Sequence, residues 1–421
     1  MTQAKATQLP HVHWLTAQPL AEVLAALNGD GEEARIVGGA VRNALLGEPP
    51  GDIDLATTAT PEEVARRAHA ASFKAVPTGV DHGTVTIVAH GHPFEVTTLR
   101  EDVETFGRKA KVAFGRDWRA DAERRDFTMN ALSLSADGTV HDYVGGLPDL
   151  KAKRVRFIGD PAKRIAEDYL RILRFFRFHA LYGDGDSDRE GLHACIAGRE
   201  GLRGLSRERV RMELFKLLVA PLAAPTLTNM SDAGLLQLVL GGVAQLASMD
   251  NMVRIEAAIG AEPDAVRRLG ALAVLIEEDA SRLSERLRLS NVEHRRLYAM
   301  AEGWRHLSPA ISEQDRRALL YRLDAESFTD RVLLAWARSG ASVDDAGWQA
   351  LVNLPGRWPI PVFPLRAAEF IARGVAKGPA LGAAMQAAKE AWITAGFPDT
   401  RAEIEAIASR IAQPHRPKPP S

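Results

Sequence analysis

The chain has a single cysteine, Cys195, among its 421 residues. One thiol can build neither a disulfide framework nor a zinc knuckle, so the sequence fits a reducing compartment. Long apolar runs are missing too. No uninterrupted stretch is long enough to span a bilayer, and the polar segment from Met1 to Pro10 lacks the apolar core of a signal peptide. We therefore expect a cytoplasmic protein that has no membrane partner.

Neither sign of charge dominates: 53 Lys and Arg residues face 54 Asp and Glu residues, for a formal net charge of -1. This balance does not indicate a nucleic-acid partner, so any surface for one must be a local patch. Hydrophobic residues make up 46% and charged residues 25% of the chain, as in ordinary globular proteins. The length suggests roughly three units at about 150 residues each.

Strand and helix signals mix in the first third of the chain, whereas only helical spacing follows Asp160. We expect strands at residues 35–37 and 53–55, a helix at 40–46, and a hairpin of 84–89 with 94–99. The charged stretch 101–122 has no clear period and is predicted to be a long mobile loop. Prolines in 354–364 interrupt the helices, and 414–421 has a disordered composition. An α+β head with an all-helical remainder follows.

Two aspartates one residue apart, Asp52 and Asp54, are the most informative feature of the chain. Side chains alternate along a strand, so both carboxylates are expected on one face while Ile53 and Leu55 face a core. Two carboxylates so close repel unless a cation neutralises them. Mg²⁺ prefers one or two carboxylates together with substrate phosphates. The pair therefore predicts phosphoryl or nucleotidyl transfer, with a polar loop as the alternative for such a motif alone.

A glycine pair, Gly38 and Gly39, lies between the first expected strand and the helix that follows it. Glycines there let backbone N–H groups approach a phosphate, and the helix N-terminus favours its negative charge. Arg42, on the first turn, can hold a phosphate through two N–H groups. A tight strand–helix turn is the alternative, and the pair alone is a weak signal. The aspartate motif that follows makes the phosphate site more specific.

Two further segments carry side chains suited to a nucleotide. Glu95 starts the second strand of the expected hairpin and would add a third carboxylate if that strand neighbours the aspartates; an exposed strand glutamate is the alternative. In 124–131, Arg125, Asp126 and Asn130 are predicted to contact triphosphate and ribose, against the alternative of a solvated charge run.

The stretch 167–177 is predicted to be a helix with one polar stripe. Asp168, Arg171, Arg174 and Arg177 recur every three residues, and a surface ladder of ion pairs is the alternative. An aspartate accepts from the exocyclic amine of cytosine or adenine, and an arginine donates to the adjacent ring nitrogen. Uracil and guanine present the reverse pattern. A pair of Asp168 and Arg171 would therefore admit C and A and reject U and G.

In this order, the motifs resemble those of the class II CCA-adding tRNA nucleotidyltransferase and bacterial poly(A) polymerase family. The glycine pair with the two aspartates matches the catalytic motif, 124–131 the ribose and nucleotide motif, 142–150 the hinge motif, and 167–174 the base-selecting motif. Four ordered motifs over about 140 residues are a specific signal. One departure is Asn43, where family members often have aspartate.

The resemblance implies the architecture: an α+β fold in which a polymerase-beta-like nucleotidyltransferase head with a mixed sheet precedes an all-α neck, body and tail. The corresponding ranges are 1–156 for the head, 157–220 for the neck with its base-selecting helix, 221–354 for the body and 355–421 for the tRNA-binding tail. The stretch 101–122 corresponds to the flexible loop of the family. Basic residues of the helix expected at 207–219 would follow tRNA phosphates.

The resemblance also implies the reaction. A template-independent enzyme would add C, C and A to tRNA lacking a complete 3′ CCA end, from CTP and ATP, without a required protein partner. Asp52 and Asp54 would hold two Mg²⁺ ions, with Glu95 as a further catalytic candidate. The candidates for nucleotide binding are Gly38, Gly39, Arg42, Arg125, Asp126, Asn130, Asp168, Arg171, Arg174 and Arg177.

Two alternatives remain beside CCA addition, and a third is rejected. A bacterial poly(A) polymerase shares all four motifs but usually carries a basic signature near the second hairpin, where this chain has Gly79, Val80, Asp81 and His82. This difference favours CCA addition. An inactive RNA-binding module of the same fold would not need the intact aspartates. A metal phosphohydrolase is rejected, because the only adjacent His-Asp pair falls in the hinge motif.

Overall fold

The computed structural model of the chain describes residues 5–9, 13–79, 83–106 and 109–413. The chain divides into two units, residues 1–242 and 243–421. The strands of the described residues belong to the first unit, and helices build the second. The α+β fold with a mixed sheet followed by helices is thereby confirmed, whereas the division into head, neck, body and tail stays a prediction.

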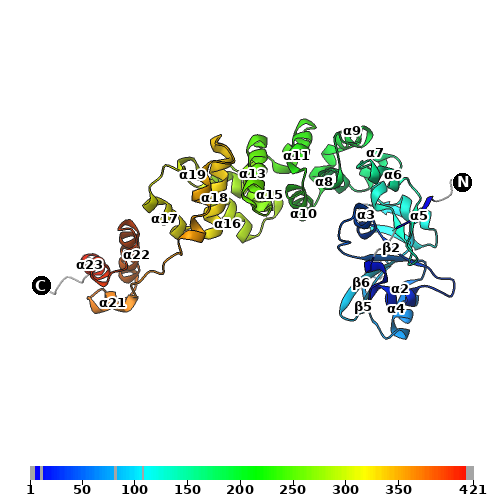
Figure 1. The fold of residues 1–421 in the computed structure, drawn as a ribbon, viewed down its shortest axis with the longest axis horizontal. Coiled ribbons are helices and arrows are strands. Elements are labelled where there is room, and N and C mark those ends of the chain that lie inside the picture. The colour runs from blue at the N-terminus through cyan, green and yellow to red at the C-terminus, as the bar shows by residue number, and fades with distance from the viewer. Residues whose placement is uncertain (1–4, 10–12, 80–82, 107–108, 414–421) are drawn as a thin grey trace. The chain divides into compact units, whose positions relative to one another are not determined.

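An eight-stranded mixed sheet forms the framework of the first unit (Figure 1). Only β3 and β6 run parallel, and the other neighbours within this sheet are antiparallel. In spatial order the strands are β1 (Lys5–Gln8), β10 (Thr139–Asp142), β9 (Ser133–Leu134), β2 (Ala34–Val37), β3 (Asp54–Thr57), β6 (His92–Thr98), β5 (Thr84–Ala89) and β4 (Lys74–Gly79).

Alternation along β5 and β6 gives this part of the sheet one apolar and one polar face. Val85, Ile87 and Val96 are buried, and α2 (Leu20–Leu27) and α4 (Pro61–Ala70) lie on this side of the sheet (Figure 1). Side chains two residues apart share a face, so Glu95 and Thr97 project from the opposite face. Because α2 and α4 lie on the apolar face, it is the polar face of the sheet that can carry catalytic side chains.

Residues 100–106 and 109–114 pair as two antiparallel strands, so the prediction of a loop over 101–122 is wrong for most of that stretch. The two arms are β7 (Arg100–Phe106) and β8 (Lys109–Phe114), and α5 (Trp118–Glu123) follows. Residues 107–108 lie outside the described part. A two-stranded ribbon pairs through its backbone and needs no apolar alternation, so its charged sequence gave no strand signal.

Aromatic side chains connect the helices that follow the sheet to the sheet-bearing part of the first unit. Phe127 and Phe157 lie with ring centroids 4.9 Å apart, and Phe175 of α8 stacks on Phe157 at 5.5 Å. These contacts join α8 to the sheet-bearing part of the unit. The remaining helices are α1 (His13–Thr16), α3 (Gly39–Leu46), α6 (Gly146–Lys151), α7 (Pro161–Glu167), α8 (Leu170–Tyr182), α9 (Arg189–Ala197), α10 (Arg207–Leu218), α11 (Ala223–Asp232) and α12 (Leu236–Leu240).

The second unit is helical throughout its described residues. The expected interruption lies between α20 and α21, although Leu354–Arg357 still forms a short helix before the prolines end it. Residues 414–421, predicted to be disordered, lie outside the described part. No helix among the described residues is long and apolar enough to cross a membrane. The helices are α13 (Leu246–Ile259), α14 (Ala265–Ala273), α15 (Glu277–Leu287), α16 (Asn291–Ala301), α17 (Glu313–Arg322), α18 (Ala325–Ser339), α19 (Ala346–Val352), α20, α21 (Ala367–Ala372), α22 (Pro379–Thr394) and α23 (Arg401–Ala412).

Candidate active site

Three carboxylates meet where β3 begins. Asp54 is the first residue of β3 and lies opposite Glu95 of β6 in the parallel register, so the neighbouring strands put both side chains on one face. Burial and the negative charges of Glu95 and Asp52 raise the pKa of Asp54, and only Arg125 opposes them. A bound cation would reduce the repulsion between these neighbouring carboxylates.

Asp52 reaches this group from outside the strand, so the expectation that one strand carries both aspartates is wrong. It lies in a bend after Gly51, whose φ of 68° is left-handed, and extended backbone begins only at Asp54. Ile53 is half-buried rather than part of the core. Both aspartates nevertheless line the same recess, which we call the central recess.

The central recess has a volume of about 680 Å³ and is strongly cationic. Seven arginines and one lysine line it, against four aspartates. An excess of cationic groups suits a ligand with several phosphates. Apart from Glu95, every residue predicted for the site lines this recess: Asp52, Asp54, Gly38, Gly39, Arg42, Arg125, Asp126, Asn130, Asp168, Arg171, Arg174 and Arg177.

The glycine pair forms the turn from β2 into α3. Gly38 has a φ of 70°, which favours glycine, and a side chain there would meet the guanidinium of Arg125 at 3.5 Å. Arg42 is buried and donates to Asn130 Oδ1 at 2.6 Å and to the Tyr182 hydroxyl at 2.7 Å. Asn43 also accepts from Arg42, at 2.9 Å, so its amide oxygen takes a role that a carboxylate could fill. Arg42 is therefore held in place although residue 43 is an asparagine and not the aspartate that is common in the family.

Asp126 and Asn130 act as a support for the arginines. Asp126 Oδ2 accepts from Nε of Arg174 at 2.7 Å, and Oδ1 accepts from the backbone of Phe127 and from Asn130. Burial alone would raise the pKa of Asp126, but Arg174 and these hydrogen bonds hold it below its usual range. The carboxylate is therefore ionised and keeps Arg174 directed along the wall of the recess.

Asp168 lies outside the helix that was predicted to carry it. It ends α7 with an extended backbone (φ −154°), and α8 begins at Leu170. Its carboxylate accepts from Arg209 at 2.6 and 3.2 Å, while Arg171 donates to Glu167 and, at 2.7 Å, to the Arg164 carbonyl. Asp168 and Arg171 thus line one recess without pairing to each other, and each is held by a partner of its own.

Sequence reasoning missed the contribution of α10. Arg209 was assigned to tRNA phosphates, yet it holds Asp168, and Lys216 also lines the central recess. Glu213, 5% exposed, accepts from Arg177 at 2.5 Å and lies 3.7 Å from Arg174. In the sequence, this buried ion pair was indicated only by an acidic residue in the middle of a basic amphipathic helix.

We expect Glu213→Ala to lower the free energy of unfolding by about 3–5 kcal/mol, because it leaves the buried Arg177 without its ion-pair partner. Urea denaturation measures the loss. Glu208→Ala, at an exposed position of the same helix, is the matched control and should cost under about 1 kcal/mol. Equal losses in the two variants would contradict a structural role for the Glu213–Arg177 pair.

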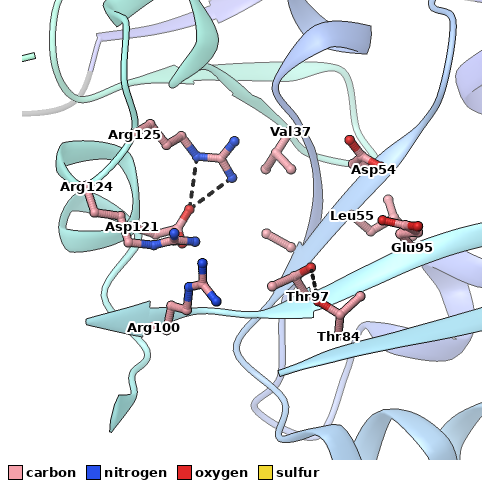
Figure 2. Close-up of a pocket in the computed structure, with 11 residues that line it drawn as sticks. Val37, Asp54, Leu55, Thr84, Glu95, Thr97, Arg100, Asp121, Arg124 and Arg125 are labelled. Carbon is pink, nitrogen blue, oxygen red and sulfur yellow. Dashed lines mark hydrogen bonds and ion pairs between the residues drawn. The ribbon is translucent and has the colours of Figure 1, made fainter. Parts of the chain in front are cut away.

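A second recess, of about 520 Å³, lies beside the carboxylates (Figure 2). Arg100, Arg124 and Arg125 line one side around Asp121, and Asp54 and Glu95 lie on the other. Asp121 accepts from Arg124 at 2.6 Å and from Arg125 at 3.1 Å. Arginines facing carboxylates across an open space suit a polyanionic ligand held with a metal ion.

The donor set at β3 fits a hard divalent cation. Among the described residues, no three His, Cys, Asp or Glu side chains lie together in an arrangement that could by itself hold a metal ion. Mg²⁺ does not need such an arrangement, since it binds through one or two carboxylates together with water and substrate phosphates. The charge cluster of Asp52, Asp54 and Glu95 beside cationic recesses meets that requirement.

Comparison with known proteins assigns the chain to a family. Residues 34–156 match the model of the poly A polymerase head domain, and 189–246 match that of a probable RNA- and SrmB-binding site of polymerase A. The chain is 34% identical to the mitochondrial CCA tRNA nucleotidyltransferase 1 of Mus musculus over 96% of this chain and 92% of that protein. The human counterpart gives the same identity over 94% and 91%. The chain belongs to the CCA tRNA nucleotidyltransferase family.

Solved structures of this family have the same fold. The Bacillus stearothermophilus CCA-adding enzyme in complex with CTP superposes with a TM-score of 0.74 at 26% identity, over 94% of this chain and 98% of that one. The Thermotoga maritima CCA-adding enzyme complexed with tRNA gives a TM-score of 0.69 at 20% identity, over 98% of this chain and all of that one. The family assignment thus extends over both units of the chain.

Proposed function

We propose that this protein adds C, C and A to the 3′ end of tRNA that lacks a complete CCA end, using CTP and ATP and releasing pyrophosphate. The observation that carries this proposal is the central recess, where base-reading side chains of the α7–α8 turn lie with the carboxylates of β3. One nucleoside triphosphate can reach both sets of groups. The nearly full-length similarity to CCA tRNA nucleotidyltransferases supports the same conclusion.

Each wall of the recess has one task in the reaction. The N–H groups of the Gly38–Gly39 turn and Arg125 bind the triphosphate, and Arg42 fixes Asn130 behind it. Asp126 and Asn130 line the same recess, where the ribose would bind next to them. The terminal hydroxyl of the tRNA attacks the α-phosphate, and the phosphoanhydride bond to the pyrophosphate breaks. Positioning these groups in line supplies much of the rate enhancement.

Asp52 and Asp54, with Glu95 as a further ligand or proton acceptor, would hold Mg²⁺. When bound, the metal lowers the pKa of the attacking hydroxyl and neutralises the leaving pyrophosphate. The raised pKa of Asp54 supports this assignment, because a divalent cation would remove the repulsion that raises it.

Poly(A) addition is the second candidate, since the head matches a model named for poly A polymerase. The arrangement of Asp168 and Arg171 admits both C and A and does not separate the two activities. The relatives over nearly the full length are named for CCA addition, and this favours that activity. We propose a cytoplasmic location without a required protein partner, although the mouse and human relatives are named mitochondrial.

Product length separates the candidates. With tRNA that ends before its CCA sequence, we expect CTP alone to add two nucleotides, ATP alone to add none, and both together to add three. Denaturing gels with labelled nucleotides measure this, and a metal chelator should stop all addition. Long tails from ATP alone would instead identify a poly(A) polymerase, and no addition with any nucleotide would identify an inactive RNA-binding protein.

A further inference from the structure

A third recess adjoins the carboxylates and has walls of a different kind. Its volume is about 780 Å³, and it shares Asp52 and Asp54 with the central recess. The other walls come from α1 and the segment that joins it to α2, from the start of α2, from the loop before β3, and from β5 and β6. We call it the Trp14 recess, after the aromatic residue of α1 that lines it.

The charge of the Trp14 recess rules out a triphosphate as its ligand. Among the described residues that line it, there is neither arginine nor lysine, whereas seven arginines line the central recess. Apolar side chains such as Leu20 and Phe94 form much of its wall, with Gln18, Thr86 and His92 as polar groups. These walls suit a flat, uncharged group with hydrogen-bonding edges, such as a nucleobase.

Trp14 is placed to receive such a group. Its side chain is half-buried, so part of its surface is open to the recess. Leu15, the next residue, is 6% exposed and anchors the short helix. Bases stack on aromatic rings with little preference for sequence, because every base has a π-face. The RNA that is extended ends in a different base from one addition to the next, so a site for its last base must accept different bases.

We propose that the Trp14 recess holds the 3′-terminal nucleotide of the acceptor RNA, with its base stacked on Trp14. This inference rests on the proposed function, since nucleotidyl transfer brings two nucleotides to one set of carboxylates. The incoming triphosphate occupies the cationic central recess. The terminal nucleotide then takes the Trp14 recess, whose described lining has no arginine or lysine and includes Asp52, Asp54 and Glu95. This places its 3′-hydroxyl at the metal-binding carboxylates.

The test compares Trp14→Ala with Trp14→Phe. Loss of one stacked base weakens binding roughly 5- to 150-fold. We therefore expect Trp14→Ala to raise the KM for tRNA by a factor in this range while the KM for CTP stays within about twofold. Trp14→Phe, which keeps an aromatic face, should restore most of the affinity. If Trp14→Ala fails to fold, Trp14→Leu replaces it and keeps an apolar side chain.

A readout independent of turnover uses tRNA whose last base is 2-aminopurine. Stacking on Trp14 should quench its fluorescence when the wild-type protein binds and leave it bright with Trp14→Ala. Equal quenching by the two proteins, or a rise in the KM for CTP instead of tRNA, would overturn the assignment of this recess. Failure of the wild-type protein to add any nucleotide would instead refute the proposed function, so the two failures are distinct.

Discussion

Asp54→Asn is expected to stop nucleotide addition while tRNA binding stays close to the wild-type level. The substitution preserves the shape of the side chain but removes a negative charge from the cluster that Asp52 and Glu95 complete, and so weakens the metal site. We expect kcat to fall roughly 10³-fold or more, the scale found when a group acting on the reacting atoms is removed. Single-turnover incorporation and filter binding of tRNA measure the two properties.

The matched control for this variant is Asp232→Asn. Asp232 is an exposed aspartate at the end of α11, where loss of a negative charge is harmless to the helix. Its activity should equal that of the wild-type protein. Substantial turnover by Asp54→Asn, with normal metal dependence, would show that the carboxylates of β3 do not carry the chemistry.

Asp168→Ala should relax the choice of base. In the proposed reaction this carboxylate accepts from the exocyclic amine of the base, and without it uracil and guanine would no longer meet a mismatched acceptor. We expect the preference for CTP over UTP, as a ratio of kcat/KM values, to fall roughly 100-fold or more. Competition between labelled CTP and UTP measures the ratio directly.

The ion pair between Asp168 and Arg209 affects how the result for Asp168→Ala is interpreted. Because Asp168 accepts from Arg209 in the structure, a base must share or displace that ion pair. Glu200→Ala removes an exposed carboxylate from the segment that precedes α10. It controls for a general loss of negative charge and should leave the selection of the base unchanged. An unaltered preference for CTP and ATP in Asp168→Ala would place base reading elsewhere in the recess.

Local features of the fold were predictable because they depend on neighbouring residues. Thr60 caps α4 and Pro61 begins it, as residues of these types do at helix starts. The strand and turn around Gly38 follow from short-range patterning in the same way. The paired strands at 100–106 and 109–114 escaped prediction because backbone pairing leaves no apolar alternation in a charged sequence. Asp168 was misplaced because a three-residue spacing cannot reveal that a helix begins two residues later.

Residue patterns identify which chemical groups the site contains and most of the local backbone around them. Which of these groups meet depends on how the whole chain folds. The pairing of β3 with β6 brought Glu95 to Asp54, and the packing of α10 on α8 brought Glu213 to Arg177, 36 residues away. It also brought Trp14 to the same carboxylates from the first helix of the chain. The physical reason is range: propensity and capping act within a few residues, whereas burial and ion pairing act between any surfaces that the fold brings together.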